Sequence, residues 1–277
     1  MKNEKINLLF SGNDYAFDGI VTSLLSITKH CSSPLDVIVF TMDLSSRNEK
    51  WKPLNDKHLS VFNNIVKKAN GESNVKLIDV TNEYLECLSG NVNEQNLYTP
   101  FAMIRLLADK VNMPDKVLYL DTDIIAMKNI KELWSESVEG YYFAGALDYY
   151  GKLFISPKYV NSGVMLLNMK YINEHKFFEK CRKIIHEKKM KFPDQTALNK
   201  IGKGKIKIIS SKFNAQKKLG KNTVIRHFAK TIIWLPYFHT RNIKPWDKKN
   251  MHKYKIHYCD DIIEEYLKIK IEFINNG

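Results

Sequence analysis

The most informative stretch of the sequence is Lys116-Val117-Leu118-Tyr119-Leu120-Asp121-Thr122-Asp123-Ile124-Ile125, an apolar run that is interrupted by two carboxylates. An apolar segment of this kind is typical of a strand buried inside a sheet. Side chains at positions i and i+2 of an extended chain point to the same side, so Asp121 and Asp123 can face one point beyond the strand end. A hard cation with phosphate ligands would fit there. The simpler interpretation is an Asp-rich turn.

Apolar strands and amphipathic helices alternate on both sides of this stretch. The first strand, residues 6–10, runs into a polar turn at Gly12, Asn13, Asp14 and Tyr15, and a helix is expected to follow with Asp18 as its N-cap. The other expected strands are residues 35–42, 75–80, 143–146, 163–167 and 206–210, and the other expected helices are residues 46–69, 99–107, 171–189 and 196–200. This alternation predicts an α/β fold, a Rossmann-like and mostly parallel sheet with helices on both faces.

Composition is that of a globular protein. The chain has 277 residues, of which 44% are hydrophobic and 26% are charged, and this composition argues against the disordered and membrane classes. No apolar run approaches the roughly 18 residues of a spanning helix, and residues 6–10 are too short for a signal-peptide core. The four cysteines are far apart in sequence and are predicted to be reduced and structural. We therefore expect a cytoplasmic protein.

Positive charge is concentrated in the last quarter of the chain. Residues 201–277 hold 17 Lys and Arg against 6 Asp and Glu, which accounts for +11 of the net charge of +13. A basic region of this kind favours an anionic partner, which could be a nucleic acid, an anionic membrane surface or a phosphorylated small molecule. A solvated basic face without a partner is the simplest alternative.

Two further segments carry residues that could serve a metal–phosphate site. His239 precedes Lys244 by five residues, so an imidazole ligand and a phosphate-binding cation lie close in sequence. His227 is the competing imidazole, and either histidine could also be an ordinary polar loop residue. Asp194 and Gln195 begin a predicted helix, where they could simply act as caps.

Together these segments make the chain resemble the family 8 retaining glycosyltransferases. These enzymes have the GT-A fold, include bacterial lipopolysaccharide galactosyl- and glucosyltransferases, and are related to glycogenin. The resemblance runs in order from residue 6 to residue 246, so we predict a GT-A nucleotide-sugar transferase domain at 1–246 and a basic, helical extension at 247–277 packed on the same domain. It rests on the following ordered motifs: Asn13-Asp14-Tyr15, Arg105, residues 116–123, Leu133-Trp134, Asn161-Ser162-Gly163, Asp194-Gln195, Ala197-Leu198-Asn199, Phe213-Asn214 and residues 239–246.

The resemblance implies a donor, a cofactor and a role for each matched residue. Asp121, Asp123 and His239 would bind Mn²⁺ or Mg²⁺, which would bridge the diphosphate of UDP-glucose or UDP-galactose and stabilise the UDP leaving group. Gln195 would lie at the anomeric carbon and agrees with a front-face substitution, while Asp194 is the alternative nucleophile. The resemblance implies that Tyr15 lies against the base, Asp14 near the ribose, Lys244 on the diphosphate, and Arg105, Asn161 and Asp194 around the sugar. The other donor-binding residues that it implies are Gly12, Asn13, Thr122 and Asn242.

Three positions depart from the pattern of this family. Gly12 stands where many members have an Asp that reads the uracil, Thr196 replaces a second Asp, and Asn242 replaces a Gly. The first departure weakens the argument for uracil as the base. Asn tolerates positive φ better than most residues, so the third is compatible with the same loop.

The acceptor and two competing functions stay open from sequence alone. The resemblance implies a saccharide or lipid-linked acceptor, with peripheral contact at the inner membrane face as one role for residues 247–277. A magnesium-dependent phosphohydrolase of the haloacid dehalogenase type also has an Asp-x-Asp after a strand, but it expects Thr or Val where Ile125 stands. A basic nucleic-acid-binding protein is the non-enzymatic alternative, and it lacks a recognisable nucleic-acid-binding fold. We therefore predict no nucleic-acid partner.

Overall fold

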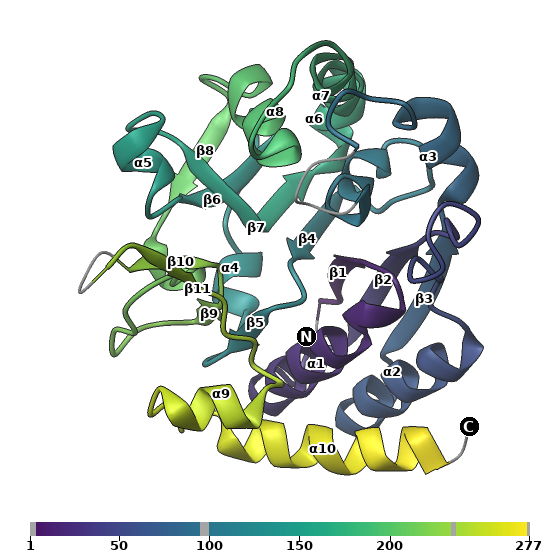
Figure 1. Ribbon diagram of the computed structural model, residues 1–277, viewed down its shortest axis with the longest axis vertical. Helices are drawn as coiled ribbons and strands as arrows, with labels where there is room; N and C mark the ends of the chain where they lie inside the picture. Colours follow the sequence, from purple (N-terminus) through teal and green to yellow (C-terminus); the bar gives the residue numbers. More distant parts are fainter. Residues whose placement is uncertain (1–3, 95–99, 234–236, 276–277) are drawn as a thin grey trace.

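The computed structural model describes residues 4–94, 100–233 and 237–275. Within these residues a seven-stranded sheet has the order β3-β2-β1-β4-β7-β6-β8 (Figure 1). Strand β7 is antiparallel to both of its neighbours, β4 and β6, while the other neighbouring pairs are parallel. The predicted α/β fold with a mostly parallel sheet is therefore confirmed. The strands are β1 Ile6–Ser11, β2 Leu35–Thr41, β3 Asn74–Asp79, β4 Lys116–Leu120, β6 Phe143–Leu147, β7 Val160–Asn168 and β8 Ile206–Ile209.

Both faces of the sheet are covered by helices. In β4, Leu118 and Leu120 belong to one buried cluster, and Val117 and Tyr119 belong to the other, as the two-residue period of a strand requires. Figure 1 shows one helical layer below the sheet and one above it. The lower layer contains α1 Phe17–His30, α2 Asp56–Ala69 and α10 Asp260–Asn275; the upper layer contains α3 Thr81–Cys87, α6 Met169–Glu174, α7 Phe177–Glu187 and α8 Pro193–Ile201.

Short elements complete the chain. Two small antiparallel sheets pair β5 Ile124–Ala126 with β9 Ile225–His227, and β10 Thr231–Ile233 with β11 His239–Arg241. The short helices are α4 Lys131–Trp134, α5 Gly151–Phe154 and α9 Lys248–Lys253, with 3₁₀ turns η1 Asp14–Ala16, η2 Pro100–Ala102, η3 Ile104–Leu107 and η4 Ser211–Phe213. All four cysteines are free, as predicted.

Several predicted helix bounds are wrong, each for a local reason. The helix expected from residue 46 begins only at Asp56, because Pro53 restricts the preceding chain and Asn55 caps the first turn through its side chain. The segment around Arg105 forms 3₁₀ turns, and the Thr99 cap lies outside the described residues. The helix expected over 171–189 is split at Lys176, whose φ of 52° is left-handed. Asp18 lies inside α1 rather than at its cap.

The C-terminal helix α10 packs along the outside of α1 (Figure 1). Ile262, Ile263 and Tyr266 are buried in the core, so these residues pack within the domain rather than lie on a membrane. The ring of Phe273 stacks on Phe17 with 4.4 Å between centroids, and Lys270 Nζ lies 2.6 Å from Asp18 Oδ2. In the described part of the chain, the helices are all too short or too polar to cross a bilayer.

Candidate active site

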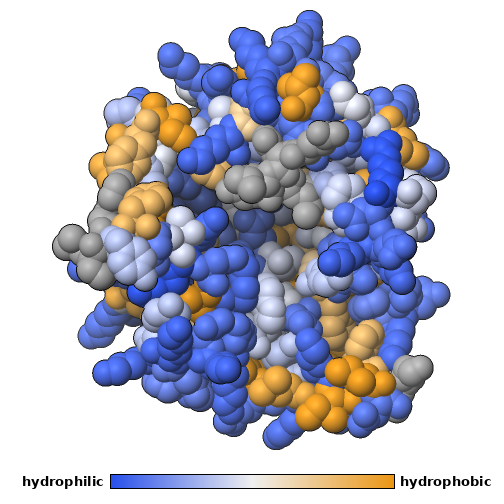
Figure 2. Space-filling view, viewed as in Figure 1, coloured by the Kyte–Doolittle hydropathy of each residue, from blue (hydrophilic) through white to orange (hydrophobic). Residues whose placement is uncertain are grey.

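The residues singled out from the sequence gather at one edge of the sheet. Strands β1 and β4 end at this edge, and β7 begins there because it runs in the opposite direction. Asn161, Ser162 and Gly163 therefore lie beside the residues that follow β4, and the Asp121 N–H donates to the Gly163 carbonyl over 2.7 Å. The space-filling view of this face is hollowed near its centre (Figure 2). The carboxyl ends of parallel strands are where α/β folds bind their ligands.

Two aspartates and one histidine converge at this edge. The chain leaves β4 after Leu120, turns through Asp121–Asp123 and enters β5. One ligand atom from each of Asp121, Asp123 and His227 can be chosen such that all three lie within 4.8 Å of one another. His227 Nε2 is 3.1 Å from Asp123 Oδ1 and 3.7 Å from Asp121 Oδ2. The convergence arises in a turn rather than along an extended strand.

Strand register explains why His227 reaches the aspartates. β9 pairs with β5 so that His227 lies opposite Ile124, the residue after Asp123. His227 Nδ1 lies 3.0 Å from Asn214 Oδ1, and this contact turns Nε2 toward the carboxylates. Gly163 gives the ring room, because a Cβ there would lie 2.2 Å from His227 Cε1. The imidazole is therefore fixed by contacts from three separate segments.

The structure places His227, the competing imidazole, beside the two aspartates, whereas His239 lies elsewhere. His239 lies on β11, where its Nδ1 is 3.0 Å from the Tyr237 carbonyl oxygen and its ring contacts the Tyr237 ring. Among the described residues it belongs to no group that could hold a metal ion. The spacing to Lys244 favoured His239 in the sequence, but the pairing of β5 with β9 brings His227 to the site instead.

Lys244 reaches the same site from the C-terminal quarter. Its Nζ lies 2.6 Å from Asp123 Oδ2, on the opposite oxygen from His227. Burial alone would raise the pKa of Asp123, but the adjacent His227 and Lys244 lower it well below its ordinary value. Burial likewise opposes the charged form of His227, and Asp123 outweighs this effect and raises the His227 pKa. The Asp123 carboxylate therefore lies between the Lys244 ammonium and the His227 imidazole.

Arg105 joins three elements beneath the aspartates. Its side chain is only 7% exposed, and its Nη2 donates to Asp121 Oδ1 over 2.9 Å. Nη1 donates to the Ser162 carbonyl over 2.8 Å, and Nε lies 3.4 Å from Asp194 Oδ2. Burial raises the pKa of Asp194, although Arg105 opposes this shift. The guanidinium also lies over the Tyr119 ring, whose hydroxyl donates to Asp121 Oδ1.

A chain of side-chain hydrogen bonds connects His227 with Gln195. After the contact of His227 with Asn214, the Asn214 amide donates to Asn161 Oδ1 over 2.9 Å. The Asn161 amide in turn donates to Asp148 Oδ2 over 2.8 Å, and Gln195 Nε2 donates to the same oxygen over 3.4 Å. Gln195 Oε1 accepts from the Ser162 N–H over 3.0 Å. Sequence reasoning missed Asp148, because no motif connects it with partners that are distant in the chain.

The residues expected near a nucleoside lie at the end of β1. Tyr15 is 65% exposed, so its ring is free to stack on a planar ligand. Gly12 follows β1 directly, and a Cβ there would lie 2.3 Å from the Cβ of Ala16, so this loop conformation excludes a larger residue. Asn13 donates to the Lys50 carbonyl over 3.1 Å, and the Asp14 carboxylate accepts from the Tyr15 N–H. These contacts shape the loop around an outward-facing Tyr15.

Thr122 and Asn242 occupy the remaining predicted positions. The Thr122 carbonyl accepts a hydrogen bond of 3.1 Å from the hydroxyl of Ser23, which belongs to α1. This bond attaches the turn that carries the two aspartates to α1. A Cβ on Gly19 of α1 would lie 2.7 Å from this carbonyl, so the close approach requires glycine. Asn242 is exposed just after β11 and lies two residues before Lys244.

The donor set at Asp121, Asp123 and His227 fits a divalent cation. Asp121 directs one carboxylate oxygen at Arg105 and the other at His227 Nε2. Asp123 directs one oxygen at Lys244 and the other at the same His227 nitrogen. Two carboxylate oxygens and one imidazole nitrogen suit Mn²⁺ or Mg²⁺. Because the ligands are held by Asn214, Arg105 and Lys244, the arrangement resembles the supported ligand shells of metalloproteins.

Comparison with protein families and curated proteins gives consistent results. The model of "Glycosyl transferase family 8" matches residues 7–250. A provisionally named glycosyltransferase of Haemophilus influenzae is 24% identical over 228 residues, which cover 76% of this chain and 64% of that protein. The glycosyltransferase GlyA of Streptococcus pneumoniae is 26% identical over 200 residues, which cover 72% of this chain and 26% of that protein. The matched region thus spans less than two thirds of either relative.

Solved structures agree on the fold. The galactosyltransferase LgtC, in complex with donor and acceptor sugar analogues, superposes with a TM-score of 0.69 at 16% identity, covering 94% of this chain and 96% of that one. The glycosyltransferase GlyE of Streptococcus pneumoniae superposes with a TM-score of 0.64 at 20% identity, covering 97% of this chain and 64% of that one. At these identities the likeness establishes a common fold, the GT-A architecture.

Proposed function

The chain belongs to glycosyltransferase family 8, and from this premise we propose that it transfers glucose or galactose, with retention, from a UDP-sugar to a saccharide or lipid-linked acceptor. The observation that carries the proposal is the convergence of Asp121, Asp123 and His227, with Lys244 on the second oxygen of Asp123. A nucleotide-sugar enzyme needs cationic groups at the leaving diphosphate, and this site has a donor set for Mn²⁺ or Mg²⁺ beside a lysine. The family assignment leaves the phosphohydrolase and nucleic-acid alternatives without support.

We assign each group at the site a part in donor binding. A divalent cation held by Asp121, Asp123 and His227 would stabilise negative charge on the departing UDP. Lys244 would pair with a phosphate oxygen as a second positive charge. Tyr15 would stack on the base, with Gly12, Asn13 and Asp14 forming the loop beneath it, while Thr122 and Asn242 line the approach to the diphosphate.

The sugar would lie between Arg105 and the hydrogen-bonded chain that ends at Gln195. Asn161 and Asp148 already share one hydrogen bond, and Gln195 contacts the same Asp148 oxygen. Asp194 Oδ2 lies 3.4 Å from Arg105 Nε, and this ion pair makes the Asp194 carboxylate a poorer nucleophile than a free one. We therefore propose that Gln195 lies beside the anomeric carbon and that substitution occurs on the front face of the sugar, with Asp194 as the alternative nucleophile.

The proposal also covers where the enzyme acts and which acceptor it uses. We propose a cytoplasmic enzyme that contacts the inner membrane face peripherally, where lipid-linked acceptors are exposed. Ile271 and Ile274 of α10 are 59% and 63% exposed, and an apolar area lies over this helix at the lower edge of the molecule (Figure 2). These side chains, rather than the buried residues at the start of α10, are the candidates for such contact.

A donor screen tests the proposed function. Purified protein is incubated with UDP-glucose, UDP-galactose, other UDP-sugars and sugars carried on other nucleotides, each with Mn²⁺, with Mg²⁺ or with EDTA. We expect UDP release from UDP-glucose or UDP-galactose in the presence of the cation and loss of that release with EDTA. Release that is confined to another nucleotide, or is unaffected by EDTA, would contradict the donor or the metal assignment respectively.

A matched pair of histidine variants tests which imidazole serves the metal. His227→Ala should weaken Mn²⁺ binding at this site by at least about 100-fold, because it removes a nitrogen ligand that Asn214 holds in place. His239→Ala should leave Mn²⁺ affinity unchanged, since its ring lies against Tyr237. Calorimetric titration of both variants with Mn²⁺ makes the comparison. Equal affinities in the two variants would refute the placement of His227.

Replacing Gln195 separates a role in chemistry from a role in binding. We expect Gln195→Ala to lower the transfer rate by about 100-fold, because an amide oriented by Ser162 and Asp148 is lost beside the reacting carbon. UDP affinity should stay close to that of the wild type, since the metal and Lys244 are untouched. Steady-state kinetics and calorimetry with UDP provide the two measurements. Loss of UDP-sugar binding instead would make Gln195 a donor-binding residue.

A further inference from the structure

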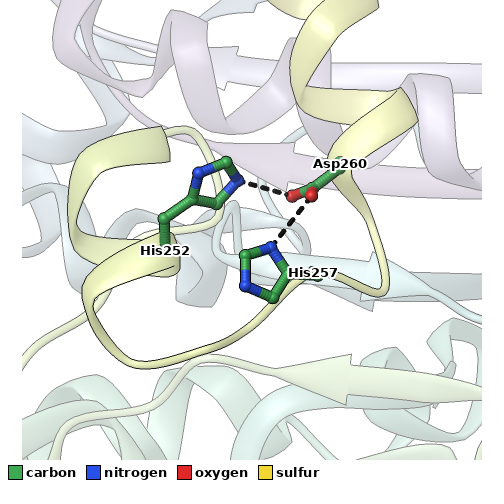
Figure 3. Close-up of side chains that lie close together, drawn as sticks. All are labelled: His252, His257 and Asp260. Carbon is green, nitrogen blue, oxygen red and sulfur yellow. Dashed lines mark hydrogen bonds and ion pairs between the residues drawn. The ribbon is translucent and has the colours of Figure 1, made fainter.

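Two imidazoles and a carboxylate come together near the C-terminal end of the chain (Figure 3). His252 Nε2 lies 3.0 Å from Asp260 Oδ1, and His257 Nδ1 lies 3.1 Å from Asp260 Oδ2. The two rings are 4.6 Å apart between centroids, and one ligand atom from each of the three residues lies within 4.8 Å of the others. Both histidines therefore direct a ring nitrogen at a common carboxylate.

The backbone between α9 and α10 produces this convergence. Helix α9 ends at Lys253, and Lys255 has a left-handed φ of 56°. The Ile256 N–H then donates back to the Met251 carbonyl over 3.0 Å, which reverses the chain so that His257 faces His252. Met251 and Cys259 are buried on either side of the turn. The three side chains thus project from α9, from the turn and from the start of α10, and Met251 and Cys259 anchor this region in the core.

We propose that His252, His257 and Asp260 form a second metal site, selective for Zn²⁺ or a similar transition metal. Two imidazole nitrogens and one carboxylate oxygen are typical zinc ligands, and a solvent molecule can complete a tetrahedral set. The side chains are 38%, 56% and 32% exposed, so an ion can reach them from solution. Mg²⁺ prefers oxygen ligands, so it should favour the two carboxylates of the first site instead.

The site would connect α9 to the helix that closes the domain. Asp260 is the first residue of α10, and its neighbour Asp261 forms an ion pair with Lys29 of α1. The far end of α10 is held on α1 by Lys270 and Phe273. A metal at the α9–α10 turn would therefore fasten the beginning of α10. These residues lie beyond residue 250, where the family match ends, so the inference does not depend on the proposed transfer activity.

Zinc stoichiometry and anomalous scattering test the proposal on the full chain without an affinity tag. Zn²⁺ is titrated by equilibrium dialysis with elemental analysis, using wild type, His252→Ala/His257→Ala and Asp121→Asn/Asp123→Asn. We expect the histidine double variant and the aspartate double variant each to lose one Zn²⁺ relative to wild type. His175→Ala, which removes an exposed histidine from the turn between α6 and α7, is the matched control and should bind as the wild type does.

The aspartate double variant isolates the second site for a measurement of stability. Saturating Zn²⁺ should raise its Tm by about 3 °C or more. The three ligands come together only in the folded chain, so the ion stabilises the folded state alone. Crystals of the wild-type protein soaked in Zn²⁺ should show an anomalous peak between His252, His257 and Asp260, which keeps the test valid if the histidine double variant fails to fold. Unchanged stoichiometry in a folded histidine double variant, or an anomalous peak only at Asp121 and Asp123, would overturn the proposal.

Discussion

Replacing Asp123 with Asn should lower metal-dependent UDP release and sugar transfer by about 1,000-fold, which corresponds to about 4 kcal/mol of transition-state stabilisation. The carboxylate lies between His227 and Lys244, whereas Asp121 contacts His227 and Arg105. An amide of the same size keeps the packing but removes the negative charge that attracts the cation. The assay is UDP release with saturating Mn²⁺, together with calorimetric Mn²⁺ affinity.

The fold of this variant should persist because both groups that contact Asp123 can adjust. The Lys244 side chain is 33% exposed and can be solvated, and the His227 ring keeps its contact with Asn214. Circular dichroism and thermal unfolding should therefore resemble those of the wild type. Asp36→Asn is a matched control, since Asp36 also pairs with a lysine but lies at the beginning of β2, at the opposite end of the sheet's parallel strands from the site. Turnover of Asp123→Asn close to that of Asp36→Asn would refute the metal assignment.

The strands could be predicted from sequence because burial on both faces of a sheet leaves an apolar run with sharp ends. The predicted bounds of β1, β2 and β4 therefore lie close to the observed ones. The antiparallel direction of β7 could not be predicted in this way, because a strand buried on both faces has the same apolar pattern whether it is parallel or antiparallel to its neighbours. That reversal is what places Asn161, Ser162 and Gly163 beside Asp121.

The two histidines illustrate a second limit of local sequence reasoning. His239 and Lys244 are close in sequence, whereas the contact of His227 with Asp123 depends on the register of β5 and β9, about 100 residues apart. Asp148 shows the same limit, because its partners Asn161 and Gln195 belong to β7 and α8. Short motifs predict which residue types the site contains. Which individual histidine or aspartate lies there depends on strand pairing between distant segments.

Replacing Arg105 with Leu should reduce the free energy of unfolding by about 3–5 kcal/mol at neutral pH, because it leaves buried charges without a partner. The guanidinium contacts the carboxylates of Asp121 and Asp194, whose side chains are 27% and 11% exposed. It also satisfies the Ser162 carbonyl. The exposed Arg47, which pairs with Glu94, offers a control: Arg47→Leu should cost less than about 1 kcal/mol. Urea unfolding of both variants provides the comparison.

The loss in Arg105→Leu should also depend on pH in a definite direction. Burial already raises the pKa of Asp194 while Arg105 opposes that rise, so removing the arginine should raise this pKa further. A carboxyl group whose pKa is higher in the folded state than in the unfolded state destabilises the folded protein. This destabilisation is complete above the folded-state pKa, and it disappears as the pH falls to the unfolded-state pKa. The difference from wild type should therefore be smaller at pH 5 than at pH 8. A deficit below about 1 kcal/mol, or one that grows on acidification, would show that Arg105 does not neutralise Asp194 in the folded protein.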